Sequence, residues 1–304
     1  MEIQLIFNSF SVLFILIGIG FLGFHLGAIK REWISALSSI ILHITLPCLI
    51  IMSMQVPLSA ERISDVISIF LIQGFIYAIS GAIALALPHL LCMPSELCGV
   101  HRYMVLFSNL GFMGYPISAA LYGPESAFYV TLVNILFALL AFSLGVYLIQ
   151  KDSKKVSLKN MLNPGLIASV LGLSFFLTGI VIPYPISASL NMLGSVTSPL
   201  AMIAIGAIIG SMPVSSMFRD TKMYAISAIR LVAIPCIAFF ILRPFISDPL
   251  LLGIPVLLSA MPVAVNTVFM AQEYGGDIEV ASRGVFLSTI LCLITLPLLG
   301  YMLL

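Results

Sequence analysis

Long apolar segments separated by short polar connections run through the whole chain. A helix that crosses a bilayer needs about 20 mostly apolar residues. Segments of this kind cover residues 5–28, 33–54, 66–88, 101–122, 126–149, 162–182, 188–212, 222–246, 250–272 and 280–303. The longest polar stretch, KDSKKVSLKN at 151–160, divides them into two groups of five. The pattern predicts an all-α integral membrane protein with ten transmembrane helices.

The two groups of segments carry prolines at matching places. Pro47 in the second segment corresponds to Pro199 in the seventh, and Pro116 in the fourth corresponds to Pro262 in the ninth. Because each group holds an odd number of helices, a second copy of the unit must be inverted in the membrane. We therefore expect two inverted five-helix repeats, at 1–150 and 161–304, joined by a linker at 151–160.

Composition excludes several classes of protein. The 304 residues are 61% hydrophobic and 8% charged, whereas a soluble domain averages roughly 25% charged residues. The net charge of +1 gives no indication of a nucleic-acid partner. The first apolar segment has no basic flank before it and no small-residue cleavage site, so we interpret it as a retained helix. The five cysteines have no metal-site spacing, and we expect no metal and no cofactor.

The basic residues are distributed unevenly between the two sides of the predicted bundle. Cytoplasmic loops of membrane proteins carry an excess of Lys and Arg. Ten of the 13 lie on one side, at Lys30, Arg31, Arg102, Lys151, Lys154, Lys155, Lys159, Arg219, Lys222 and Arg283. Only Arg62 and Arg243 lie on the other side. We therefore expect a multi-pass protein of the cell membrane with a cytoplasmic 151–160 loop and both termini outside.

The fourth and ninth apolar segments each contain a proline at a nearly matched position, Pro116 in SNLGFMGYPIS and Pro262 in LLSAMPVAVNTVFM. Proline lacks an N–H and its ring strikes the carbonyl one turn back, and in lipid every backbone polar group needs a partner. Paired interruptions at corresponding positions are typical of transporters, whose substrate site lies near the bilayer midplane. We expect the fourth and ninth helices to be broken at Pro116 and Pro262 and to cross.

The residues around these prolines suit an anionic ligand. An amide in lipid needs hydrogen-bond partners, and free N–H groups at half-helix N-termini favour anions. The alternative is that glycine and proline kink tightly packed helices while the asparagines bond to neighbours; the matched positions favour the site. The predicted substrate-binding residues are Asn109, Gly111, Gly114, Tyr115, Pro116, Pro262, Asn266 and Thr267.

The runs SNLGFMGYP and SAMPVAVNTVF, followed by YGGD and STILCLITLP, resemble the auxin efflux carrier family along the whole chain. That family includes plant auxin exporters and prokaryotic transporters proposed to move small carboxylates such as malonate. The chain lacks the long hydrophilic central loop of many plant members. The resemblance implies that Asn109 and the segment around Pro116, facing Pro262 and Asn266, hold the carboxylate of a small organic anion.

The same resemblance implies a fold like that of the bile-acid symporters. Helices 1, 2, 6 and 7 would form a scaffold, and helices 3–5 and 8–10 would form a transport bundle that moves by an elevator mechanism. Helices 4 and 9 would cross at their interruptions. A homodimer through the scaffold helices is a further expectation.

Coupling to a proton or to sodium is a separate question. His43 lies one turn before Pro47, and histidine titrates near physiological pH; it could carry a coupled proton or be an ordinary interface histidine. Ser108, Asn134 and Thr289 could contact a coupled cation or bond to backbone. A sodium-coupled symporter of bile-acid type, on the same fold, is therefore the alternative, although no acidic residue lies near the expected crossing.

Arg230 lies about eight residues into the eighth segment. Its charge could attract an anionic substrate, or its long side chain could snorkel to the cytoplasmic surface. We favour the second interpretation. The expected crossing then contains neither Lys nor Arg, and backbone dipoles and amides would recognise the anion.

Two other classes of membrane protein are disfavoured. An intramembrane enzyme would need paired aspartates, a Ser–His dyad or zinc ligands. All five aspartates fall in loops or at helix ends, and neither GxSG nor HExxH occurs. A channel would need a path lined by rings of polar or charged residues, and no such ring stands out.

Overall fold

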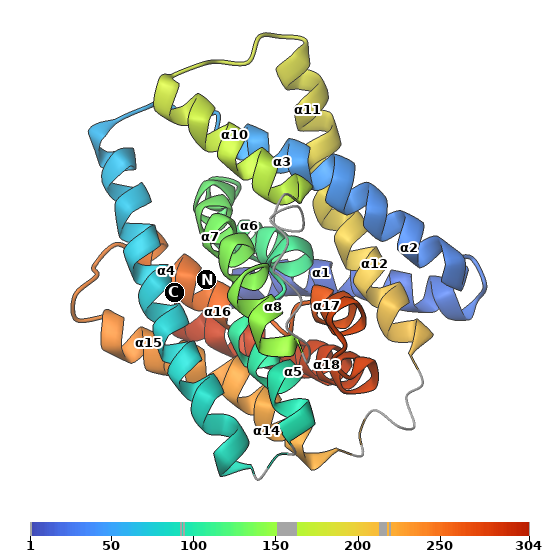
Figure 1. Cartoon of the computed structure of the whole chain (residues 1–304). Helices are drawn as coiled ribbons and strands as arrows, with labels where there is room; N and C mark the ends of the chain where they lie inside the picture. Colours follow the sequence, from blue (N-terminus) through green and yellow to red (C-terminus); the bar gives the residue numbers. More distant parts are fainter. Residues whose placement is uncertain are drawn as a thin grey trace. The chain divides into compact units, whose positions relative to one another are not determined.

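The computed structural model describes residues 2–91, 93, 95–150, 163–212, 218 and 220–303, and throughout these ranges the regular structure is helical, without strands (Figure 1). The predicted linker at 151–160 lies outside the described residues. Six helices are long and apolar enough to cross a membrane: Arg31–Ser53, Ala60–Pro88, Ser126–Ile149, Ile186–Ser211, Thr221–Leu242 and Ile278–Leu303. The predicted all-α class is confirmed, and these helices are those of a multi-pass membrane protein.

Other helices or interrupted helices occupy the remaining predicted segments. Apolar helical stretches of 10–17 residues cover Phe10–His25, Pro164–Thr178 and Pro249–Ser259. The fourth predicted segment contains α5 (Ser95–Leu106) and α6 (Tyr115–Tyr122), and the ninth contains α16 (Pro249–Ser259) and α17 (Asn266–Tyr274). In each of these two segments, a non-helical stretch of three or more residues separates the helices.

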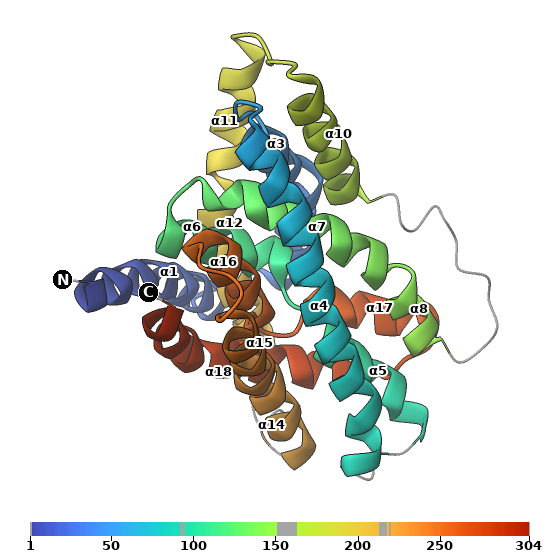
Figure 2. The same cartoon turned by 90° about the vertical axis from the view of Figure 1, so that its left-hand side faces the viewer.

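The chain folds into two compact units that alternate along the sequence. The first unit comprises Met1–Ile69, Gly111–Ile135 and Leu162–Met212, and the second comprises Phe70–Leu110, Leu136–Met161 and Pro213–Leu304. Two long helices, α4 (Ala60–Leu90) and α7 (Ser126–Ala141), begin in the first unit and end in the second. Figure 2 shows α4 as one continuous helix along its whole length.

The first unit is built around two close helix contacts. In it, α1 (Glu2–His25) packs along α12 (Thr197–Ser211), and α3 (Leu46–Ser53) lies between α10 (Pro164–Thr178) and α11 (Ile186–Ser195) (Figure 1). Glycine permits the first contact, because a Cβ atom at Gly206 would collide with the backbone carbonyl of Ile17. Small residues of this kind let membrane helices approach each other closely. α2 (Arg31–Ile40) leads into α3.

The second unit gathers most of the C-terminal helices. α18 (Ile278–Leu303) packs against α5, α14 (Thr221–Ala228), α16 and α17, and α15 (Ile234–Leu242) packs against α16. α8 (Leu144–Ile149) packs against α5 and α17. Asp248 begins α16 as its N-cap, since its carboxylate accepts from the backbone N–H groups of Leu250 and Leu251 at 2.8 and 2.9 Å. Gly275 ends α17 in the left-handed conformation, with φ of 77°.

Three π-helical turns each precede a proline in the first turn of the next helix. The turns are Ile41–Thr45, Leu110–Gly114 and Ile229–Ala233, and the prolines are Pro47, Pro116 and Pro235. A π turn adds one residue ahead of the proline, which displaces the carbonyl that the ring would otherwise strike. The helix therefore continues past the proline instead of breaking.

The interruption predicted at Pro116 is consequently misplaced. Helix α5 ends at Leu106, residues 107–109 are non-helical, and helical backbone resumes at Leu110. Pro116 lies in the first turn of α6, where its missing N–H is not needed. Pro262, by contrast, lies inside the non-helical segment between α16 and α17, as predicted.

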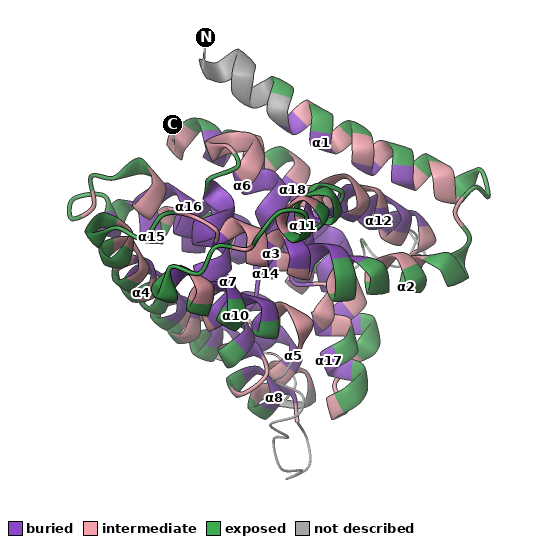
Figure 3. Ribbon diagram, turned by 90° about the horizontal axis from the view of Figure 1, so that it is seen from above, coloured by how far each residue is buried: buried purple, intermediate pink, exposed green. Residues whose placement is uncertain are grey.

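Apolar side chains cover much of the outer surface. On α4, Ile67, Leu71 and Leu85 are 57%, 69% and 57% exposed, and Figure 3 shows exposed positions along this helix. A water-soluble protein would bury such a row, whereas hydrocarbon solvates it at no loss. These surfaces are suited to contact with lipid.

Candidate functional site

The two interruptions lie in the second unit and bond to each other. Asn109 donates its backbone N–H to the carbonyl of Pro262 at 2.9 Å, and Ala264 donates its backbone N–H to the carbonyl of Phe107 at 3.1 Å. Ser108 and Val263 thus form an antiparallel bridge between the two segments. We call residues 107–109 and 260–265 the paired interruptions. Each supplies hydrogen-bond partners that the other lost when its helix stopped.

Ser288 of α18 supports the paired interruptions from a third element. Its hydroxyl oxygen accepts the backbone N–H of Val263 at 3.0 Å, and the hydroxyl donates to the carbonyl of Gly284 at 2.6 Å. Thr289, predicted as a contact for a coupled ion, donates its hydroxyl to the carbonyl of Val285 at 2.6 Å. Thr289 therefore bonds within its own helix, whereas Ser288 stabilises the non-helical backbone.

Arg230 is a buried member of the same region. Its side chain is 2% exposed. Nη1 donates to the carbonyls of Val105 and Leu106 at 2.7 and 3.5 Å, and Nε donates to the carbonyl of Met261 at 3.3 Å. The expectations that Arg230 snorkels to the surface and that the crossing lacks a basic residue are therefore wrong.

The reason for this burial is the hydrogen-bond requirement of helix ends. The last four carbonyls of a helix have no intrahelical donor, and α5 ends at Leu106 deep in the protein. A guanidinium presents five N–H donors in a planar fork, so one side chain can satisfy carbonyls of two segments. The signal in the sequence was a charged residue in the middle of an apolar helix, which is by default a functional candidate.

Three predicted site residues keep buried polar atoms without a protein partner. These atoms are Asn109 Nδ2, Asn266 Oδ1 and Thr267 Oγ1, for which no hydrogen bond is found among the described residues. Asn109 and Thr267 are 3% and 0% exposed. Buried polar groups in proteins are nearly always bonded. Donors and acceptors of this kind beside the paired interruptions mark a place that a polar ligand can occupy.

The remaining predicted site residues lie in the first unit. The hydroxyl of Tyr115 hydrogen-bonds to that of Thr131 at 3.1 Å, and Asn134 donates its amide to the hydroxyl of Ser169 at 3.4 Å. His43 is exposed, and its Nδ1 lies 3.0 Å from the carbonyl of Ser39 in the same helix. These polar side chains therefore have protein partners within the first unit.

The two glycines of the fourth segment lie in its helical part and not in its interruption. Gly111 and Gly114 belong to the π-helical turn Leu110–Gly114 that precedes Pro116. A Cβ atom at Gly111 would lie 3.6 Å from the Leu46 side chain, an ordinary contact distance. Neither glycine has a positive φ, so the turn does not require them for backbone conformation.

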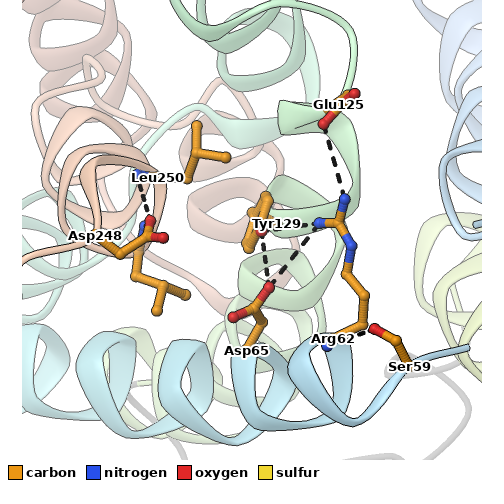
Figure 4. A network of polar contacts seen from close by, with 8 residues as sticks. Ser59, Arg62, Asp65, Glu125, Tyr129, Asp248 and Leu250 are labelled. Carbon is orange, nitrogen blue, oxygen red and sulfur yellow. Dashed lines mark hydrogen bonds and ion pairs between the residues drawn. The ribbon is translucent and has the colours of Figure 1, made fainter.

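A second polar cluster, which the sequence did not reveal, joins the first turns of α4 and α7 in the first unit (Figure 4). Arg62 Nη1 donates to the hydroxyl of Tyr129 at 2.8 Å, and that hydroxyl donates to Asp65 at 2.9 Å. Glu125 lies 3.8 Å from Arg62 Nη2. Both acids partner the arginine, which indicates a structural contact between helix starts.

The described residues contain no group of three or more His, Cys, Asp or Glu side chains that could hold a metal ion.

The chain is similar to known membrane transport proteins over nearly its whole length. The sequence profile of the family described as "Membrane transport protein" matches residues 5–300. A protein named as an uncharacterized transporter of Methanocaldococcus jannaschii is 25% identical over 96% of this chain and 97% of its own length. Another, from Methanothermobacter thermautotrophicus, is 28% identical over 93% and 94%.

Proposed function

The chain belongs to the membrane transport protein family, the auxin efflux carrier-like transporters, and we propose that it carries a small organic anion, a carboxylate, across the membrane. It is a membrane transporter and not an enzyme. We further propose that transport occurs by alternating access of the elevator type.

The polar groups beside the paired interruptions support a carboxylate as the substrate. Beside the paired interruptions, a buried guanidinium accompanies three buried polar atoms without protein partners, among them the amide donor of Asn109. A donor amide and a nearby positive charge suit a carboxylate, because charge-assisted hydrogen bonds are roughly twice as strong as neutral ones. The backbone N–H groups in the first turn of α17 add a partial positive charge.

The alternation of the two units supports the elevator mechanism. Predicted helices 1, 2, 6 and 7, the proposed scaffold, all lie in the first unit, and predicted helices 8–10 lie in the second. Of predicted helices 3–5, only parts lie in the second unit. We propose that the chain has ten transmembrane helices in two inverted repeats, with helices 4 and 9 crossing at the paired interruptions. The scaffold would also carry a homodimer contact.

The orientation is proposed from the distribution of basic residues. Ten Lys and Arg residues on one side against two on the other favour a cytoplasmic 151–160 loop and termini outside the cell.

Uptake into proteoliposomes tests the proposed function. Purified protein is reconstituted, and the entry of radiolabelled malonate and of an aromatic carboxylate, indole-3-acetate, is measured under an imposed membrane potential. We expect saturable uptake of at least one acid and no uptake in protein-free vesicles. Failure to transport or bind any small carboxylate, by protein that remains folded, would reject the proposed substrate class.

A further inference from the structure

The carbonyls that Arg230 contacts are groups of the kind that can hold a free cation in a transporter. In many secondary transporters, the unwound carbonyls of discontinuous helices coordinate sodium or take part in proton coupling. Here the carbonyls of Val105, Leu106 and Met261, two from the end of α5 and one from the segment after α16, all accept hydrogen bonds from one guanidinium. The positive charge at these carbonyls belongs to the protein itself.

The hydrogen bonds at the end of α5 show which carbonyls have backbone donors and which have Arg230 as their donor. At the end of α5, the carbonyl of Tyr103 accepts from Phe107 N–H at 2.9 Å, and the carbonyl of Phe107 accepts from Ala264 N–H. Val105 and Leu106 lie between Tyr103 and Phe107 in the chain, and their carbonyls accept from Arg230. Arg230 thus supplies donors to two carbonyls at a helix end that backbone donors satisfy only in part.

The charge of Arg230 has no protein counter-ion within the described residues. The ion pairs found there involve Arg62 and Arg283, and none involves Arg230. Burying an ion is expensive unless other groups compensate it. Carbonyl dipoles satisfy the hydrogen bonds of the guanidinium but leave its net charge, so an anion beside the paired interruptions would gain from it.

We propose that Arg230 is a tethered cation: it holds the paired interruptions together through three carbonyls and supplies the fixed positive charge that makes the neighbouring site selective for anions. This inference rests on the proposed function and deepens it. Arg230 is a positioning residue, since it acts on the ligand through the backbone and through its field. Because the cation is covalently attached, transport needs no sodium ion at these carbonyls.

The first experiment measures charge selectivity. Binding of malonate and of its neutral diamide, malonamide, is compared for wild type, Arg230→Gln, Arg230→Lys and the control Arg243→Gln, which removes an exposed arginine at the end of α15. We expect Arg230→Gln to lose at least about tenfold of the preference for malonate, which corresponds to about 1.4 kcal/mol. Arg230→Lys should keep most of the preference, and Arg243→Gln all of it. A preference unchanged in Arg230→Gln would overturn the proposal.

The second experiment replaces the tethered cation by a free one. Arg230→Ala leaves space near the carbonyls, and guanidinium ion at a few millimolar is added, with urea as the neutral compound of similar shape. We expect guanidinium to raise the thermal unfolding temperature of Arg230→Ala, with urea and the wild-type protein showing no such effect. Equal effects of urea and guanidinium would show that shape and not charge matters, and would overturn the proposal.

The wild-type protein provides a test that does not depend on how a variant folds. Uptake driven by an imposed potential is compared in sodium and in choline medium at constant pH. We expect equal rates, and a requirement for sodium would overturn the proposal. If no carboxylate binds to the wild type at all, the proposed function fails. The unfolding experiment then still decides whether Arg230 is the cation that holds the carbonyls.

Discussion

At the scale of single residues, some polar groups at the paired interruptions have hydrogen-bond partners among the described residues and others have none. Arg230 donates to carbonyls in the last turn of α5, and Ser288 accepts from the non-helical backbone N–H of Val263. Asn109 and Asn266 keep side-chain atoms without a partner. A structural asparagine in an apolar environment would bond to a neighbour, so the unpartnered amide nitrogen of Asn109 favours a binding role for it.

Alanine substitution of either asparagine tests that role. We expect Asn109→Ala and Asn266→Ala each to weaken carboxylate binding by about 1–3 kcal/mol, the range for a hydrogen bond to a charged group, or roughly 5- to 150-fold in Kd. Equilibrium binding of malonate to purified protein measures the effect.

Asn191→Ala serves as the matched control, because Asn191 is exposed on α11 in the first unit. It should bind like the wild type. If both site variants also retain wild-type affinity, the substrate binds elsewhere.

At the scale of secondary-structure elements, the surroundings of a proline decide what it does. Pro116 follows a π-helical turn and begins a helix, whereas Pro262 lies in non-helical backbone whose carbonyl accepts from Asn109. The same residue type thus continues one segment and interrupts the other.

The two prolines should therefore respond differently to alanine. Pro262→Ala introduces a buried N–H and lets α16 extend, so we expect it to lower the transport rate by at least about tenfold, or about 1.4 kcal/mol in the barrier. Pro116→Ala leaves residues 107–109 and their bonds in place and should reduce transport by less than about threefold. Initial uptake rates in proteoliposomes give the comparison, and equal losses in both variants would show that Pro116 also maintains the interruption.

The contact between α1 and α12 depends on glycine. Gly206→Ala places a Cβ against the backbone of Ile17, and overpacking of this kind costs about 1–3 kcal/mol. We expect a lower thermal unfolding temperature for this variant in detergent.

Gly18→Ala is the control in the same helix pair, since no atom lies within 4 Å of a Cβ built there. It should be neutral or slightly stabilising, because glycine inside a helix costs about 0.5–1 kcal/mol relative to alanine. A Gly206→Ala protein as stable as the wild type would show that the two helices can separate without loss.

At the scale of the whole molecule, the chain forms two compact units out of alternating stretches of sequence. Helices α4 and α7 pass from one unit to the other. If the proposed elevator mechanism holds, these two helices must bend or tilt, so hinge motion is expected within them or at their ends.

The orientation in the membrane is testable with cysteine labelling. In a background without the five natural cysteines, Ser153→Cys and Ser187→Cys should lie on opposite sides. An impermeant maleimide added to intact cells should modify only Ser187→Cys, and permeabilised cells should show both sites modified. Labelling of Ser153→Cys in intact cells would reverse the proposed orientation.

The sequence by itself determined the properties that depend on local composition. Apolar segments of membrane length establish an all-α membrane protein, because a bilayer leaves the backbone few ways to satisfy its hydrogen bonds. The run from Ser108 to Pro116 identified the family, which the profile match confirmed. The interruption at Pro262 was also predictable, since proline removes a donor wherever it stands in a helix.

Only the tertiary structure decided where the fourth segment breaks and what Arg230 does. Residues 107–109 are non-helical because Pro262 and Ala264, more than 150 residues away, exchange backbone hydrogen bonds with them. Arg230 is buried because carbonyls at the end of α5 and after α16 need a donor that their own segments do not supply. Such partners are distant in sequence, so no local pattern around residue 107 or residue 230 announces them.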